Sequence, residues 1–146
     1  MIARHPNDAG YPAALRDLVL APDPLWLDGD EGVLDRPSVA IVGTRRMSPY
    51  GERVARELAA ALAHAGAVVV SGLAQGIDCA AHGAAMDAGG ASVAVLGEGI
   101  TSFLANARGR RRRLAATLRA HGALVSPYPP IVPAQFQLGG KQAQLA

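Results

Sequence analysis

"VAIVGTRRMSPYGERVARELAAAL", residues 39–62, joins a short apolar run to an amphipathic stretch and sets the pattern for the rest of the chain. The run 39–43 is apolar and rich in β-branched residues, as expected of a parallel strand covered on both faces. Ser48 can cap a following helix, and Pro49 fits the first turn of that helix. The stretch therefore predicts a strand, a loop with two arginines and a helix. The helix carries one apolar stripe, formed by Val54, Leu58, Ala61 and Leu62.

The same alternation continues along the chain. Apolar runs at 67–72, 91–97 and 123–128 predict three more strands, and the segments 77–90 and 110–122 predict two more helices. Short apolar strands that alternate with helices form a parallel sheet with right-handed crossovers. We therefore predict an α/β fold of the Rossmann-like, doubly wound class, with a mainly parallel sheet and helices on both faces. A TIM barrel would need nearly twice this length.

The first 37 residues form a short N-terminal extension ahead of this pattern. Their apolar stretch 25–27 contains Trp26, the single tryptophan of the chain. A free linker would expose this indole, so we expect the segment to pack as a cover on the main domain. The predicted division is an N-terminal cover segment over 1–37 and a Rossmann-like domain over 38–146.

Composition is typical of compact intracellular proteins. The 146 residues carry a net charge of only +2, half of them are hydrophobic and 17 are glycine, as in a single domain with many tight turns. The one cysteine, Cys79, cannot form an intrachain disulfide, and no Cys/His pattern has zinc-ligand spacing. The sequence starts with no signal-like segment, and its apolar runs are shorter than ~18 residues. We expect a soluble cytoplasmic protein with no metal and no membrane contact.

Three of the predicted strands end in glycine, at Gly43, Gly72 and Gly97. In an open α/β sheet these ends share one edge, where ligands bind. Glycine lets backbone N–H groups approach an anion closely, and a helix N-terminus such as the one at Ser48 adds positive potential. The sequence therefore predicts a phosphate pocket at the carboxyl edge of the sheet.

Arg45 and Arg46 follow the first of these glycines. We expect Arg45 to hold a phosphate through paired hydrogen bonds, in a geometry that lysine cannot match, and Arg46 to belong to the same site while pointing elsewhere. The alternative is that both side chains are solvated or pair with acids such as Glu52 and Asp78. Tyr50, close to the arginines, is the best candidate to stack on a base, unless its ring only packs the helix start.

The glycine loops do not match the fingerprints of nucleotide-dependent enzymes. The stretch 72–76 is not a G-x-G-x-x-G motif, and 43–51 lacks the Lys-Ser/Thr ending of a P-loop. Asp78 and His82, four residues apart, could form a hydrogen bond or an acid/base pair, although such a pair at a helix start is more often structural. Glu98 could orient a ribose hydroxyl or simply occupy a turn. We therefore expect no enzyme activity and no cofactor.

Five stretches of the chain resemble the DNA-processing protein A family, also called DprA or Smf. They are YPAALRDL, PLWLDGD, VAIVGTRRMSPYG, VVVSGLAQGIDCAAHGAAMDAGG and VAVLGEG, and they occur in family order over residues 11–99. The resemblance implies a Rossmann-like domain without catalysis that binds single-stranded DNA. It further implies a protein that is often a homodimer and passes DNA to the RecA recombinase during natural transformation. The implied DNA-binding positions lie on two family motifs: Gly43, Thr44 and Arg45, then Ser71, Gly72, Ala74, Gly76, Ile77, Asp78 and His82.

The resemblance weakens beyond Gly99. Typical members carry a Tyr-Pro and a downstream Asn after the third strand, and a basic F-P-x-R-N-R stretch after the fourth. Here the C-terminal segment offers Phe136 and one basic residue, Lys141. Each lost phosphate contact should flatten the salt dependence of single-strand binding by ~0.7. We hypothesise that the run 108–113, with five arginines, compensates; the alternative is a solvated helix start.

Two other functions stay open. A sensor of the related Rossmann-like group would bind a free nucleotide or a nucleotide-derived signal at the same edge. A phosphoribohydrolase of the lysine-decarboxylase-like group would carry a P-G-G-x-G-T-x-x-E motif, which this sequence does not contain. The first hypothesis is therefore a DprA-like protein of DNA processing, with the small-molecule sensor as its alternative.

Overall fold

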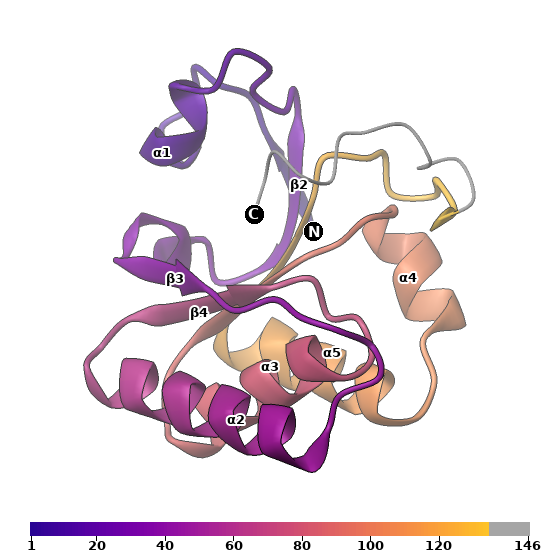
Figure 1. The fold of residues 1–146 in the computed structure, drawn as a ribbon. Helices are drawn as coiled ribbons and strands as arrows, with labels where there is room; N and C mark the ends of the chain where they lie inside the picture. The colour runs from indigo at the N-terminus through magenta and orange to yellow at the C-terminus, as the bar shows by residue number, and fades with distance from the viewer. Residues whose placement is uncertain (135–146) are drawn as a thin grey trace.

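The computed structural model describes residues 1–134. Within them, one mixed sheet has the strand order β1-β2-β6-β5-β4-β3 (Figure 1). The four strands from β6 to β3 are parallel, and β2 runs antiparallel to both of its neighbours. The strands are β1 (Ile2–Arg4), β2 (Leu25–Gly29), β3 (Ser38–Ala40), β4 (Val68–Ser71), β5 (Ser92–Val95) and β6 (Ala123–Ser126).

Helices lie on both faces of this sheet. The longer helices α2, α3 and α5 cover one face, and the short helices α1 and η1 lie over the other (Figure 1). This arrangement confirms the predicted α/β, Rossmann-like class with a mainly parallel sheet. The helices are α1 (Ala13–Arg16), the 3-10 helix η1 (Glu31–Asp35), α2 (Pro49–His64), α3 (Ile77–Asp87), α4 (Ile100–Asn106) and α5 (Gly109–His121).

Local sequence signals explain where α2 begins and α3 ends. Ser48 is the N-cap of α2, because its hydroxyl accepts a hydrogen bond from the N–H of Gly51 at 3.0 Å, and Pro49 takes the first helical position. Beyond α3, Gly89 has a φ of +77°, which glycine adopts without strain. The start of α2 agrees with the prediction, whereas α3 ends at Asp87, three residues before the end of the predicted segment 77–90.

Alternate residues of the central strands build two parts of the core. Ala94 of β5 and Leu124 of β6 face the helices and pack in a cluster with Phe103. Val93 and Val125, their neighbours in sequence, belong to the cluster on the opposite face. The continuous apolar runs are thus explained by burial on both sides of the sheet.

The N-terminal segment extends the sheet as well as covering it. β2 pairs with β6, with Leu27 opposite Val125, and both Leu25 and Leu27 are buried. Tyr11 is buried in the same cluster, and its hydroxyl donates a hydrogen bond to the carbonyl of Pro22 at 2.8 Å. Residues 1–37 therefore share their core with the parallel strands.

Two expectations about burial were wrong. β3 is an edge strand whose residues are all exposed, so the stretch 39–43 is not covered on both faces within the described chain. The buried side of α2 is formed by Ala55 and Ala59, while Leu58 of the predicted stripe is 53% exposed. Ala59 packs among alanines of α3, and such small side chains let the two helices approach closely.

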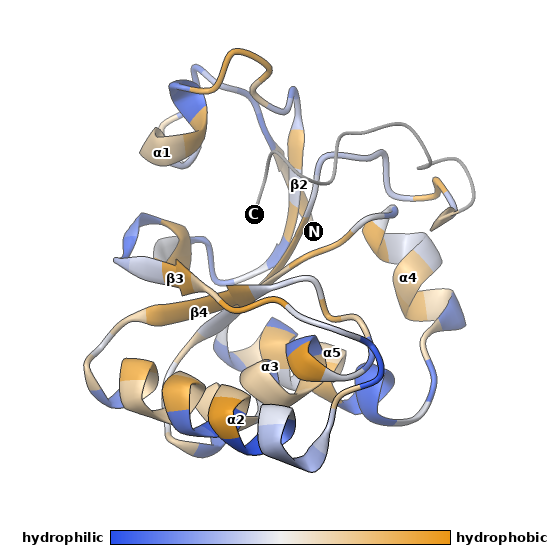
Figure 2. Ribbon diagram, in the orientation of Figure 1, coloured by the Kyte–Doolittle hydropathy of each residue, from blue (hydrophilic) through white to orange (hydrophobic). Residues whose placement is uncertain are grey.

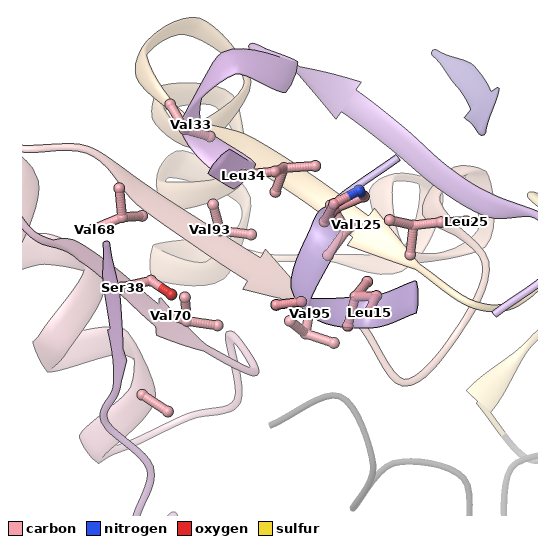
Figure 3. A pocket seen from close by; sticks show the side chains of 13 residues that line it. Leu15, Leu25, Val33, Leu34, Ser38, Val68, Val70, Val93, Val95 and Val125 are labelled. Carbon is pink, nitrogen blue, oxygen red and sulfur yellow. The ribbon is translucent and has the colours of Figure 1, made fainter. Parts of the chain in front are cut away.

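The sheet face opposite the long helices carries an apolar groove of about 240 Å³. Figure 3 shows strand residues such as Val70 and Val95 forming its floor, with Leu15 of α1 and Leu34 of η1 beside them. In residues 1–134, no helix has both the length and the apolar character needed to cross a membrane.

Candidate functional site

The carboxyl ends of β4 and β5 open into a polar pocket of about 360 Å³. Three of the predicted site residues, Arg45, Gly72 and Gly97, line it together, as the shared strand edge led us to expect. Figure 2 shows the hydrophilic loop after β3 on the same side of the molecule as the hydrophilic start of α5. The lining residues are Arg45, Gly72, Ala74, Gln75, Leu96, Gly97, Glu98, Phe103, Arg111 and Ala134.

The loop that carries Arg45 is held against the start of α3. The N–H of Ile77 donates to the carbonyl of Thr44 at 3.2 Å, and the hydroxyl of Thr44 accepts from the N–H of Arg46 at 3.1 Å. Gly76 has a φ of +84°, and any side chain there would collide with the Thr44 carbonyl. The glycine of the family motif thus has a structural reason, since it allows the two segments to touch.

Arg45 lines the pocket and Arg46 does not. Within residues 1–134 neither side chain forms an ion pair or hydrogen bond, so the pairing with Glu52 or Asp78 that we considered does not occur there. Both arginines are exposed. Arg45 is therefore a lining residue whose side chain is unpaired within the described part of the chain, whereas Arg46 is not among the lining residues.

Asp78 uses the amides that we had assigned to a ligand. Its carboxylate, which is buried, accepts hydrogen bonds from the N–H groups of Gly72 at 3.1 Å and Ala74 at 3.3 Å. A Cβ at position 72 would lie 2.9 Å from this carboxylate, so glycine makes room for it. The expectation that the Gly72 amide faces a phosphate needs correction: an internal carboxylate already occupies it, and Asp78 shapes the loop.

His82 and Ser71 lie in the core, which corrects their assignment as ligand contacts. His82 is 0% exposed, and its Nδ1 bonds to the hydroxyl of Ser92 at 2.7 Å. That hydroxyl donates to the carbonyl of Val69 at 2.6 Å, so Nδ1 carries the proton and donates. Burial lowers the pKa of His82 to about 3, which keeps it neutral. Ser71 is similarly committed, because its hydroxyl donates to the carbonyl of Ile41 at 2.6 Å.

The remaining predicted positions do not line the pocket or fall outside the described chain. Tyr50 is 67% exposed on α2 and is not a lining residue; the guanidinium of Arg53 sits 5.4 Å from its ring centre. Gly43, Thr44 and Ser48 also lie outside the lining. Lys141 falls beyond residues 1–134.

Arg111 is the residue that sequence reasoning missed as an individual. Its Nε donates to the carbonyl of Leu73 at 2.9 Å, and its guanidinium lies 4.9 Å from the ring centre of Phe103. The helical phase could have identified it, because Ala115 and Leu118, four and seven residues later, form the buried side of α5. The run 108–113 therefore sends one side chain into the pocket.

Glu98 adds a carboxyl group to the same pocket. Burial raises the pKa of Glu98, and the nearby positive charge of Arg111 partly opposes this effect. The hydroxyl of Ser126 donates to the Glu98 carbonyl at 2.8 Å and so ties this loop to β6. The pocket thus combines two guanidinium groups with one carboxyl group.

Fold and pocket together define a Rossmann-like domain with a cationic pocket at the carboxyl edge of its sheet. Sequence comparison makes this class specific. The family model described as DNA recombination-mediator protein A matches residues 3–138, and the chain belongs to this family. It is a family of recombination mediators rather than of enzymes.

Similar proteins come from several bacteria. Protein Smf of Escherichia coli is 41% identical over 84% of this chain and 32% of its own length. The structure of DNA processing protein A (DprA) from Streptococcus pneumoniae superposes with a TM-score of 0.81 at 33% identity, covering 91% of this chain and 46% of that one. For DNA processing protein A from Helicobacter pylori the TM-score is 0.75 at 29% identity, over 87% and 57%. The chain spans about a third of the length of the curated relatives it matches.

Proposed function

We propose that this chain binds single-stranded DNA at the carboxyl edge of its sheet, as a DprA-like protein of DNA processing and natural transformation. Arg45 carries the proposal: it lines the pocket and has no ion pair or hydrogen bond within residues 1–134. A guanidinium in such a position can hold a phosphate oxygen pair with planar geometry. Backbone phosphates offer that group at every nucleotide, so the binding is independent of base sequence.

Relatives support the choice of ligand. The solved structure of the Helicobacter pylori protein is described by its single-stranded DNA binding mode. That protein covers 87% of this chain in the structural comparison. We transfer its ligand class to this chain, because single-stranded DNA would supply phosphates to a pocket that contains two arginines.

Titration of labelled single- and double-stranded oligonucleotides at two salt concentrations tests the proposal. We expect single-strand binding that weakens with salt, and an Arg45→Ala variant that binds about tenfold more weakly or worse at low salt. Arg46→Ala removes the same charge one residue away, outside the lining, and should change affinity by less than about threefold. Equal losses in both variants would show that charge near the loop matters and that the pocket does not.

The family resemblance extends the proposal to partners and place. We infer that the protein works in the cytoplasm as a homodimer and hands its DNA to RecA. Light scattering on the purified chain measures its oligomeric state. Co-precipitation in the presence of a single-stranded oligonucleotide tests whether the chain binds RecA. A monomer that does not retain RecA would restrict the function of this chain to DNA binding.

One observation favours a second candidate, a sensor of free nucleotides. Glu98 brings a carboxyl group into a pocket that also holds two arginines, and a nucleotide offers hydroxyl or amino donors to it as well as phosphates. The volume of about 360 Å³ lies within the range of small-ligand sites, ~300–1,000 Å³. Thermal shifts with free nucleotides that exceed those with oligonucleotides would favour this sensor.

A further inference from the structure

Arg111 differs from every other arginine of the run 108–113. It is half-buried, whereas Arg108, Arg110, Arg112 and Arg113 are exposed. The Nη1 of Arg108 donates hydrogen bonds to the carbonyls of Ala105 and Ala107, at 2.8 and 2.9 Å, where α4 ends. The five side chains are therefore not one diffuse patch of charge.

The protein holds the Arg111 guanidinium in place from two sides. Its Nε donates to the carbonyl of Leu73, in the loop after β4, and its plane lies over Phe103, a ring that is only 2% exposed. Both partners belong to one cluster of buried core residues. An arginine fixed in this way loses little conformational freedom when it binds a ligand.

This anchoring leaves the far side of the guanidinium available. With Nε committed, four N–H donors remain on the two Nη atoms, and no hydrogen bond or ion pair in residues 1–134 uses them. Arg111 lines the same pocket as Arg45, although the two residues come from distant parts of the sequence. Paired donors of this geometry match two oxygens of one phosphate.

We propose that Arg111 is a second phosphate-binding residue of this site, and that it contacts a phosphodiester group of the single-stranded DNA whose backbone Arg45 also holds. The proposal rests on the proposed function. It also assigns the compensating role considered for the whole run to one residue: Arg110, Arg112 and Arg113 contribute no specific phosphate contact.

The salt dependence of oligonucleotide binding separates a phosphate contact from a structural role. We expect Arg111→Gln to weaken binding about tenfold at low salt and to reduce the slope of log affinity against log salt by about 0.7. Arg112→Gln, an equal charge change on an exposed neighbour, should keep the slope and stay within about twofold in affinity. Arg111→Lys should retain the slope but bind more weakly, because it lacks the planar pair of donors.

A measurement on the unmodified protein covers the case in which Arg111→Gln folds poorly. Phenylglyoxal modifies accessible arginines, and mass spectrometry locates the adducts. Single-stranded DNA should protect Arg111 and Arg45 and leave Arg112 reactive.

The outcomes distinguish this inference from the proposed function. One outcome would overturn the inference and leave the proposed function standing. In it, Arg45→Ala loses salt-dependent binding, Arg111→Gln keeps the full salt slope, and DNA does not protect Arg111 from modification. An equal reduction of the salt slope in Arg111→Gln and Arg112→Gln would also overturn it. The arginines of the run would then attract DNA by their summed charge and not through one specific contact. Absence of single-strand binding in the unmodified chain would overturn both.

Discussion

The apolar groove on the sheet face and the polar pocket at the carboxyl edge differ in chemistry more than in size. The groove on the sheet face, about 240 Å³, is lined by aliphatic side chains, with Ser38 as its polar member (Figure 3). The pocket at the carboxyl edge, about 360 Å³, gathers Arg45, Glu98 and Arg111. A phosphate moved into the groove would lose its hydration without a partner, whereas the pocket offers charge-assisted hydrogen bonds. The charged side chains that line the pocket therefore identify it as the candidate site, and the presence of a cavity alone does not.

The difference has its origin in the chain. The groove is formed by every second residue of the strands, such as Val93 and Val125, so it follows from the apolar pattern that forms the sheet. The pocket is formed by the loops that follow β3, β4 and β5, together with Phe103 of α4, Arg111 of α5 and Ala134. Substitutions in the groove should alter stability, and substitutions in the pocket should alter binding.

A charge placed in the groove gives the largest expected effect. Val93→Asp would bury a carboxylate at a position that is 3% exposed, and we expect a loss of about 3–5 kcal/mol in the free energy of unfolding, measured by urea denaturation. Val19→Asp, at a position 99% exposed, should stay within about 0.5 kcal/mol. A stable Val93→Asp protein that no longer binds DNA would instead make the groove the binding surface.

Removing the carboxylate beneath the pocket ranks second. Asp78→Ala leaves the N–H groups of Gly72 and Ala74 without their acceptor, so the free energy of unfolding should fall by about 1.5–3 kcal/mol. Asp87→Ala, which removes only an exposed ion pair with Arg56, should cost less than about 1 kcal/mol. Two variants of equal stability would mean that Asp78 is not needed to shape the loop.

Acid should weaken the core below the pocket through His82. Its pKa falls from the ordinary 6.5 to about 3 in the folded protein, so the unfolded chain binds the proton first. The stability due to neutral His82 is present above pH 6.5 and is lost as the pH falls towards 3, by about 1.4 kcal/mol per unit or about 2 kcal/mol at pH 5. Urea denaturation at pH 7 and pH 5 measures it. His82→Asn should abolish this difference and His64→Asn, an exposed substitution on α2, should retain it.

The smallest expected effect concerns the carboxyl group inside the pocket. Glu98→Gln removes a negative charge that repels phosphate, so single-strand affinity at neutral pH should rise about two- to threefold. Because burial raises the pKa of Glu98, the unmodified protein should gain affinity on mild acidification, and Glu98→Gln should not. Glu57→Gln, on the exposed side of α2, is the matched control. Weaker binding by Glu98→Gln would favour a ligand that donates hydrogen bonds to this carboxyl group.

Sequence patterns predicted most of the parallel half of the fold. The runs that became β4, β5 and β6 were clear because they are apolar and end at turns, and Ser48 marked the start of α2. α4 was missed because it follows Gly99 without a side-chain cap. The pairing of β2 with β6 is a long-range contact that no local signal encodes.

The sequence predicted which edge of the sheet carries the site, but it did not predict the hydrogen bonds of the individual groups there. Strand ends placed Arg45, Gly72 and Gly97 together, as the structure has them. The internal use of the Gly72 amide by Asp78 was hidden, because it depends on how a loop folds back over a helix start. The helical phase alone places Arg111 on the buried side of α5, four residues before Ala115 and seven before Leu118.

The carboxylate of Asp78 has a consequence for the speed of recognition. Because this carboxylate accepts hydrogen bonds from the N–H groups of Gly72 and Ala74, the loop 72–78 needs no bound anion to satisfy these donors. We therefore expect the loop to have the same form before and after a ligand binds. A ligand then binds to a preformed loop, so we expect diffusion and long-range charge attraction to set the association rate. Differences in affinity among variants of the pocket should accordingly appear as differences in how long the complex lasts.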